Sequence, residues 1–148
     1  MELRTEIEIA AAPGAVWAIL ADFPGYASWN PFIVHIVGEL RVGAKLAVTL
    51  SPPGGSDTTF HPKVLVADPE RELRFRGALV RGLFDDEHFL QLAEVSPGRT
   101  RVVHGANLTG LMVRAMGGSI TNLARGCVYM NQALQRQVEQ GPGRRRPR

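Results

Sequence analysis

The chain has 148 residues, of which 45% are apolar and 21% are charged. This length suits one domain, and the composition is typical of a soluble globular protein and excludes a disordered chain. The one cysteine, Cys127, excludes an intramolecular disulfide and a metal site made of cysteines alone. No apolar run approaches the ~20 residues that span a bilayer, and the N-terminus is charged, unlike a signal peptide. We therefore expect a cytoplasmic protein.

The formal net charge of +3 comes from the end of the chain. Residues 141–148 hold four arginines and no acidic residue, and without them the chain has 13 basic and 14 acidic residues. We expect a domain over residues 1–140 and a disordered basic tail over residues 141–148, whose deletion leaves the fold unchanged. Because the domain is nearly neutral, we expect no specific nucleic-acid partner.

The first part of the chain combines one strand with a helical segment. Residues 2–9 place apolar or threonine side chains at every second position, which predicts a half-buried strand. Pro13 suits the first turn of a helix, and the apolar residues after it recur every three or four positions. The pattern predicts a helix over residues 11–23 and a further helical turn over residues 25–29.

Strand-like segments separated by turn residues occupy the middle of the chain. They cover residues 32–39, 44–51, 60–67, 72–77, 83–95 and 100–109. Turn signals at intervals of about ten residues, with no helix between them, predict an antiparallel meander. The segment around His35 is too apolar to show which way this histidine faces.

The last element is a helix with a long apolar stripe. Its members step by three or four residues: Met112, Met116, Ile120, Leu123, Cys127, Met130, Leu134 and Val138. Gly117-Gly118 interrupts the stripe, so the helix either kinks there or begins only at Ser119. The inner face of the predicted sheet is the natural partner of this stripe.

Short motifs along the chain resemble a known superfamily. They include Ala12-Pro13 before Val16-Trp17, then Asp22-Phe23, Tyr26, Trp29-Asn30-Pro31-Phe32, Gly82-Leu83-Phe84-Asp85 with Glu87-His88, and Met130-Asn131 with Ala133-Leu134. In this order they resemble the START/Bet v 1-like superfamily, and within it the polyketide cyclase/dehydrase-type SRPBCC proteins. The resemblance implies an α+β helix-grip fold. In that fold a curved seven-stranded antiparallel sheet surrounds a long C-terminal helix, and two short helices follow the first strand.

The resemblance also implies a cavity between sheet and helix that suits an apolar or aromatic ligand. Strand alternation directs His88, His104 and Asp86 toward this cavity, and a histidine there is a candidate general acid/base. The same histidines are alternatively hydrogen-bonded core residues, and Trp29 and Phe32 either belong to the core or rim the entrance. The candidate ligand-binding residues are Trp29, Phe32, Phe60, Phe75, His88, Leu90, His104, Met112, Met116, Ile120, Leu123 and Cys127.

Two functions remain open. The first is a binding protein for a hydrophobic or aromatic small molecule, lipid-like or polyketide-like. The second is a polyketide cyclase/dehydratase-type enzyme that uses a cavity histidine as general acid/base. A metal site made of His88, His104 and a carboxylate lacks a compact ligand motif, so we expect no metal and no other cofactor. We expect a monomer or a homodimer without a membrane span, with Cys127 as a small core residue.

Overall fold

The computed structural model describes residues 1–80 and 84–140, so the predicted basic tail lies outside the described residues. The elements follow the order β1 (Glu2–Ile9), α1 (Pro13–Ala21), the 3₁₀ helix η1 (Phe23–Gly25), α2 (Tyr26–Trp29), β2 (Ile33–Val37), β3 (Ala47–Leu50), β4 (Thr58–Phe60), β5 (Lys63–Asp68), β6 (Glu72–Val80), β7 (Phe84–Ser96), β8 (Arg99–Thr109), the 3₁₀ helix η2 (Val113–Ala115) and α3 (Gly117–Gln140). Among the described residues, no helix combines the length and apolarity needed to cross a membrane.

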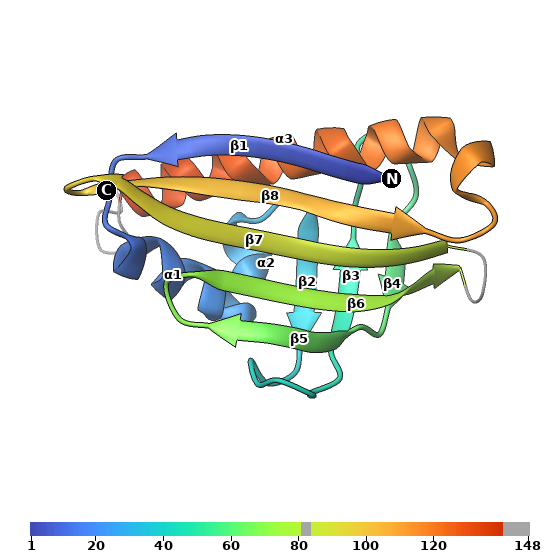
Figure 1. The fold of residues 1–148 in the computed structure, drawn as a ribbon, viewed down its shortest axis with the longest axis horizontal. Coiled ribbons are helices and arrows are strands. Elements are labelled where there is room, and N and C mark those ends of the chain that lie inside the picture. Colours follow the sequence, from blue (N-terminus) through green and yellow to red (C-terminus); the bar gives the residue numbers. More distant parts are fainter. Residues whose placement is uncertain (81–83, 141–148) are drawn as a thin grey trace.

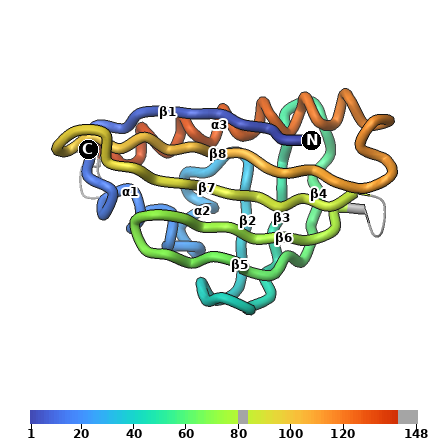
Figure 2. The backbone as a smooth tube through the Cα atoms, viewed as in Figure 1, coloured from blue at the N-terminus to red at the C-terminus, as the bar shows by residue number. Residues whose placement is uncertain are grey.

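The strands form two antiparallel sheets that α3 helps to close into one core. The larger sheet has the order β1-β8-β7-β6-β5, and the smaller has the order β2-β3-β4. Figures 1 and 2 show the long strands running along the molecule, with β2, β3 and β4 crossing behind them at a steep angle. The long helix α3 packs on β1 and β8, and α1 and α2 contact it. The predicted α+β helix-grip architecture is confirmed.

The described residues form eight strands where seven were expected, because the predicted strand over residues 60–67 is divided at Pro62. β4 pairs with β3 in the small sheet, whereas β5 pairs with β6 in the large one. Proline has no N–H to donate to a ladder, which favours a break at this point. The Pro62 carbonyl accepts a hydrogen bond from the Leu46 N–H. A Cβ on the neighbouring Gly77 would lie 2.8 Å from the Pro62 Cα, so only glycine fits this corner.

The helix α3 begins at Gly117, at the glycine pair itself, so it neither continues through the pair from an earlier start nor begins only at Ser119. Met112 and Met116 therefore both precede the helix, and Met112 is 36% exposed, so extending the helical stripe back to these two residues was wrong. The stripe within the helix is buried, from Ile120 to Leu134. His35 is exposed on β2.

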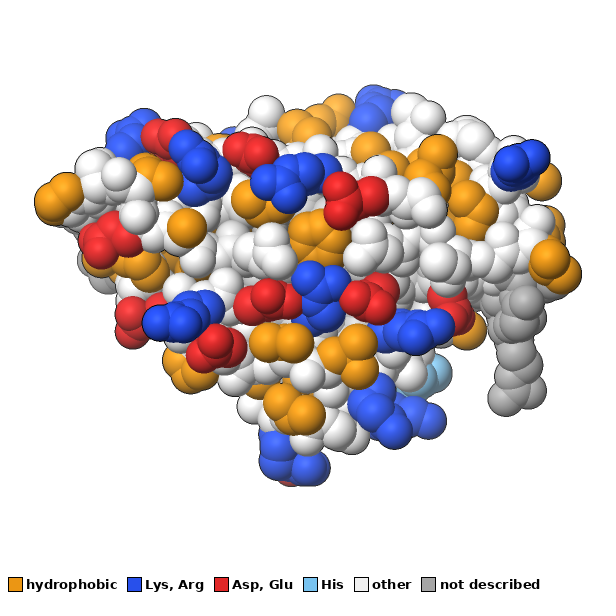
Figure 3. All heavy atoms as spheres, viewed as in Figure 1, with side chains coloured by type: hydrophobic (Ala, Val, Ile, Leu, Met, Phe, Trp, Pro, Cys, Tyr) orange, Lys and Arg blue, Asp and Glu red, His pale blue; other side chains and the backbone are white. Residues whose placement is uncertain are grey.

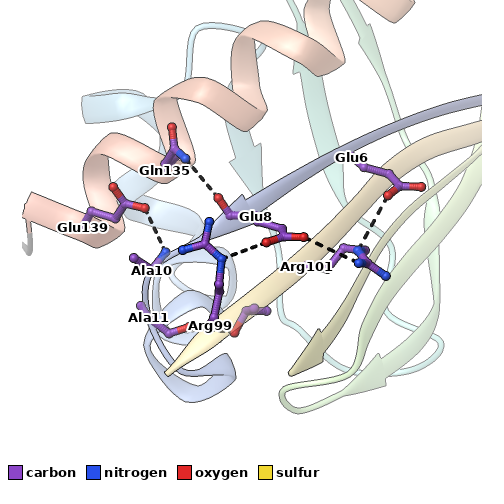
Figure 4. A network of polar contacts seen from close by, with 9 residues as sticks. Glu6, Glu8, Ala10, Ala11, Arg99, Arg101, Gln135 and Glu139 are labelled. Carbon is purple, nitrogen blue, oxygen red and sulfur yellow. Dashed lines mark hydrogen bonds and ion pairs between the residues drawn. The ribbon is translucent and has the colours of Figure 1, made fainter. Parts of the chain in front are cut away.

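Charged side chains cover the outer surface of the large sheet and connect β1 to its neighbours. Glu8 forms ion pairs with Arg99 and Arg101 of β8, at 2.8 and 3.5 Å, and Figure 4 shows this network. From α3, Gln135 donates to the Glu8 carbonyl, and Glu139 accepts from the Ala10 N–H. Figure 3 shows acidic and basic side chains alternating over this face of the molecule. Because such exposed pairs each stabilise little, the core carries most of the stability.

Candidate functional site

Two histidines meet in the interior where β7 and β8 lie side by side. In the β7–β8 ladder His88 is opposite Ala106 and His104 is opposite Leu90, so the two histidines are diagonal neighbours on the inner face. Their Nε2 atoms are 2.7 Å apart, and their side chains are only 2% and 0% exposed. Alternation along each strand predicted the inward direction of both.

Asn131 of α3 and Thr5 of β1 determine how the His104 ring is protonated. The Thr5 hydroxyl donates to the His104 carbonyl at 2.6 Å, so its oxygen accepts from the Asn131 amide NH₂ at 2.8 Å. The Asn131 Oδ1 then faces His104 Nδ1 at 2.9 Å and requires an N–H there. His104 therefore carries its proton on Nδ1, and its Nε2 accepts from the His88 Nε2–H.

The surroundings keep His104 uncharged and Cys127 protonated. Burial, reinforced by the neighbouring His88, lowers the pKa of His104 from 6.5 to about 3. Burial also raises the pKa of the Cys127 thiol far above its usual value, and the nearby Asp86 adds to this effect. A thiol with so high a pKa is a poor nucleophile, which agrees with the prediction of a core residue.

Asp86 continues the polar chain on the other side of His88. Its side chain is 1% exposed, and its Oδ2 lies 3.6 Å from His88 Nδ1, which is too long for a hydrogen bond. Among the described residues, neither Asp86 Oδ1 nor His88 Nδ1 has a hydrogen-bond partner. Asp86, His88, His104 and Asn131 are buried, and with the half-buried Thr5 they form one row of polar groups from β7 to β1.

Aromatic rings enclose the histidine pair. Phe75 stacks on His88, with ring centroids 5.3 Å apart and planes 11° apart. Phe32 lies 6.2 Å from His88 and 6.4 Å from His104, measured between ring centroids. The histidines are therefore packed among side chains and do not line an open space.

A cavity of about 200 Å³ lies farther along the core, between the small sheet, the ends of β6 and β7, and the first turns of α3. Its lining residues are Leu50, Pro52, Gly55, Ser56, Thr58, Leu79, Phe84, Met116, Ser119, Asn122 and Leu123. The buried members are Leu50, Phe84 and Leu123, whereas Ser56, Thr58 and Ser119 are exposed. The cavity thus has an apolar floor and a polar rim, and none of these lining side chains is charged.

The polar row starts directly behind the cavity wall. Phe84, in the wall, and Asp86 are two positions apart on β7 and share its inner face. On α3, Leu123 of the wall lies one helical turn before Cys127. A ligand on the cavity floor is therefore one side chain away from the buried carboxylate.

A more open depression of about 740 Å³ flanks the other side of the first turn of α3. Met1, Leu108, Val113, Arg114 and Ile120 are among its lining residues. It lies between η2, α3 and the end of β8.

The predicted site residues occupy three different places. Met116 and Leu123 line the cavity, and Ile120 lines the open depression. Phe32, Phe75, His88, His104 and Cys127 belong to the packed interior around the histidine pair. Trp29, Phe60, Leu90 and Met112 are not among the described residues that line either space.

Most of the cavity wall was missed by sequence reasoning. The loop over residues 51–57 was recognised by its composition, but nothing in the sequence indicates that it packs on the helix. Gly54 has a φ of +77°, and a Cβ at this position would lie 3.5 Å from the Asn122 side chain. The turn chemistry of this loop therefore predicts a tight turn, and only the fold shows its contact with Asn122.

Solved structures with the same fold have low sequence identity to this chain. The Zhui aromatase/cyclase from Streptomyces sp. R1128 aligns with a TM-score of 0.77 and 18% identity, covering 95% of this chain and 94% of that one. A START superfamily protein from Mycobacterium smegmatis aligns with a TM-score of 0.66 and 20% identity, covering 94% and 97%. The di-domain ARO/CYC BexL aligns with a TM-score of 0.73 and 16% identity, covering 96% of this chain and 51% of that one.

The sequence comparisons give the family. No curated protein sequence is similar enough to the chain to count as a match. A family model described as polyketide cyclase / dehydrase and lipid transport matches residues 1–139, nearly the whole chain. Together with the helix-grip architecture, this match shows that the chain belongs to the polyketide cyclase / dehydrase and lipid transport family.

Proposed function

We propose that the protein binds a small, uncharged, largely apolar molecule in the cavity between the small sheet and α3, and that this molecule is aromatic or polyketide-like. The observation that carries the proposal is the uncharged lining, apolar on the floor and polar at the rim. Such a lining favours a ligand with a hydrophobic body and a few oxygen atoms at one edge. Ser56, Thr58, Ser119 and Asn122 are the rim side chains available to hydrogen-bond those oxygens.

The size of the cavity favours a compact ligand over a long lipid. Its volume of about 200 Å³ is below the ~300–1,000 Å³ typical of ligand pockets. A long-chain lipid would need a larger opening of the core than a flat ring system. The aromatase/cyclases among the structural neighbours support the same class of ligand.

A thermal-shift screen tests this proposal. The panel contains flavonoids and polyketide aromatics on one side, and fatty acids and sterols on the other. A ligand at 100 times its Kd is expected to stabilise the protein by about 2.7 kcal/mol. We expect a rise in Tm with flat oxygenated aromatics. A rise with fatty acids alone, or with no member of the panel, contradicts the proposal.

A pair of tryptophan variants locates the binding site. Met116→Trp places a large ring in the cavity wall and is expected to abolish the ligand-induced rise in Tm. Leu111→Trp is the matched control, because Leu111 is 86% exposed and lies outside the cavity lining. It should keep the full rise. Equal shifts in both variants would place the ligand elsewhere.

Acid–base catalysis is the second candidate function, favoured by the row Asp86–His88–His104 directly behind Phe84. A ligand that displaces the Phe84 ring would meet this row, and a histidine pair can move a proton during enolisation or dehydration of a poly-carbonyl substrate. His88→Gln is then expected to abolish turnover of such a substrate while binding persists. His35→Gln, an exposed histidine, is the control. Loss of binding together with turnover would instead indicate a structural role for His88.

A further inference from the structure

Three potential metal ligands from three different elements converge behind the cavity. His88 of β7, His104 of β8 and Cys127 of α3 place their ring nitrogens and thiol sulfur within 4.8 Å of one another, and all three are buried. We propose that these three residues bind a transition-metal ion of the Zn²⁺ class. Imidazole nitrogen and thiolate sulfur are ligands that Zn²⁺ and Co²⁺ accept, whereas Mg²⁺ and Ca²⁺ prefer oxygen.

The orientation of His104 suits a metal ligand. Its Nδ1–H donates to the Asn131 Oδ1, so the lone pair of Nε2 points toward His88. Metal-binding histidines usually donate their second ring N–H to an oxygen in this way, which fixes the ring and its tautomer. Thr5 holds the Asn131 amide and thereby completes the outer support of the site.

The unpartnered atoms of Asp86 and His88 are a second, independent observation. Both side chains are at least 98% buried, yet Asp86 Oδ1 and His88 Nδ1 have no hydrogen-bond partner among the described residues. If a metal takes the lone pair of His88 Nε2, the ring proton moves to Nδ1. There it faces the Asp86 carboxylate, 3.6 Å away. Metal binding would thus place an N–H donor opposite the buried Asp86 carboxylate, and a small movement of the His88 ring would shorten the 3.6 Å gap to a hydrogen bond.

The distances and charges are compatible with a bound ion after a small adjustment. The two Nε2 atoms are 2.7 Å apart. Zn–N bonds of ~2.0–2.1 Å in a tetrahedron need them about 3.3 Å apart. The Cys127 thiol loses its proton to solvent when the Zn–S bond forms, and no electron is transferred. The resulting thiolate and the Asp86 carboxylate then balance the two positive charges of the ion.

This inference is independent of the proposed ligand, because the three side chains lie behind the cavity and not in its wall. Because the three side chains are buried, the metal has to be added while the protein is unfolded. An ion cannot reach side chains that are 0–2% exposed without an opening of the core. The full chain is therefore unfolded and refolded with Co²⁺ alone, excess metal is removed by desalting, and the absorption spectrum and cobalt content are measured.

We expect about one Co²⁺ per chain, with the visible bands of a tetrahedral site whose fourth ligand is a water molecule. A thiolate-to-cobalt charge-transfer band should appear in the near ultraviolet. Cys127→Ala should lose the charge-transfer band, and since alanine fills most of the same space, circular dichroism should show a folded protein. Asn131→Leu should bind the metal about 10–100-fold more weakly, as expected for loss of an outer partner. A zinc-loaded sample should show one sulfur neighbour at ~2.3 Å by X-ray absorption.

The exposed histidines provide the matched control. His35→Ala and His61→Ala remove the two surface imidazoles and should leave the cobalt spectrum unchanged. The proposal is overturned if the refolded wild type retains no cobalt. It is equally overturned if the bound cobalt lacks the thiolate band, or if binding survives in Cys127→Ala but disappears in the His35 and His61 variants.

Discussion

His104 is kept neutral by burial and by the neighbouring His88, and contacts from three elements fix the orientation and tautomer of its ring. Asn131 of α3 accepts its Nδ1–H, Thr5 of β1 orients Asn131, and His88 of β7 approaches its Nε2. None of these three partners, Asn131, Thr5 and His88, provides a negative charge beside a protonated His104 ring. Burial, together with His88 beside the ring, makes protonation of His104 in the folded protein costly, and the Asn131 hydrogen bond offsets part of this cost.

This cost predicts that stability falls in mild acid. The pKa of His104 is about 3 in the folded protein and 6.5 when the group is exposed. Between these values the unfolded chain binds a proton that the folded chain does not, so stability is complete above pH 6.5 and decreases as the pH falls toward 3. The slope attributable to one such group is at most about 1.4 kcal/mol per pH unit. Urea unfolding at pH 7, 6, 5 and 4 measures it.

Two variants separate His104 from the carboxylates that also titrate in acid. His104→Gln removes the titrating ring and should flatten the dependence of stability on pH between 6.5 and 4, although it lowers stability throughout. His61→Gln changes an exposed histidine and should give the wild-type slope. If both variants keep the wild-type slope, His104 is not the group that couples protons to folding.

At the scale of a single element, α3 borders the cavity with its first turns and packs against the core with its middle. Its first turns face the cavity through Ser119, Asn122 and Leu123, and Met116 lines the cavity just before the helix begins. Its middle approaches the core so closely that a Cβ on Gly126 would collide with the ring of Phe32. Gly126 is therefore required by packing and not by a turn, which explains a glycine in the interior of a helix despite its poor helix propensity.

Two glycine-to-alanine changes in α3 should have opposite effects. Gly126→Ala should destabilise the protein by about 1–3 kcal/mol, because overpacking against Phe32 outweighs the gain in helix propensity. Gly118→Ala, whose Cβ would meet nothing within 4 Å, should be neutral or stabilise by up to about 1 kcal/mol. Chemical denaturation measures both. Stabilisation by Gly126→Ala would mean that Phe32 has room to move aside.

The sequence predicted the direction of side chains better than their depth. Alternation along β7 and β8 placed Asp86, His88 and His104 on the inner face, and burial confirms this direction. It could not distinguish a cavity wall from a packed core, because both require inward side chains. Whether an inward-facing side chain lines a cavity or packs against other side chains depends on the distance between sheet and helix. The division of the predicted strand over residues 60–67 depended in the same way on sheet pairing, a long-range property.

The Asn131–Thr5 support was invisible for a related reason. Asn131 follows Met130 of the apolar stripe, and a polar residue next to such a stripe is expected at the edge of the buried helix face. Its role depends on meeting Thr5, which lies 126 positions earlier in the chain. The overall architecture was accessible because ordered motifs over the whole chain carried the family resemblance, whereas the site depends on contacts between distant elements.

At the scale of the whole molecule, the core has a packed end and a hollow end. The packed end surrounds the histidine pair, with Phe32 and Phe75 against the rings. The hollow end lies between the loop over residues 51–57 and the first turns of α3. Segments next to a cavity make fewer buried contacts, so they open more easily by local unfolding. A bound ligand therefore stabilises these segments more than the packed end of the core.

Hydrogen exchange with and without a bound flavonoid should therefore change at one end only. We expect slower amide exchange over residues 54–58 and 116–123, which border the cavity, and unchanged exchange in β1 and in residues 127–140 of α3. Met116→Trp, which fills the cavity, should show no slowing at the same flavonoid concentration. Slower exchange over residues 108–114 without a change over residues 54–58 would instead place the flavonoid in the open depression beside Arg114. A uniform slowing over the whole chain would mean that binding stabilises the fold globally and that the hollow end is not a separate unit of opening.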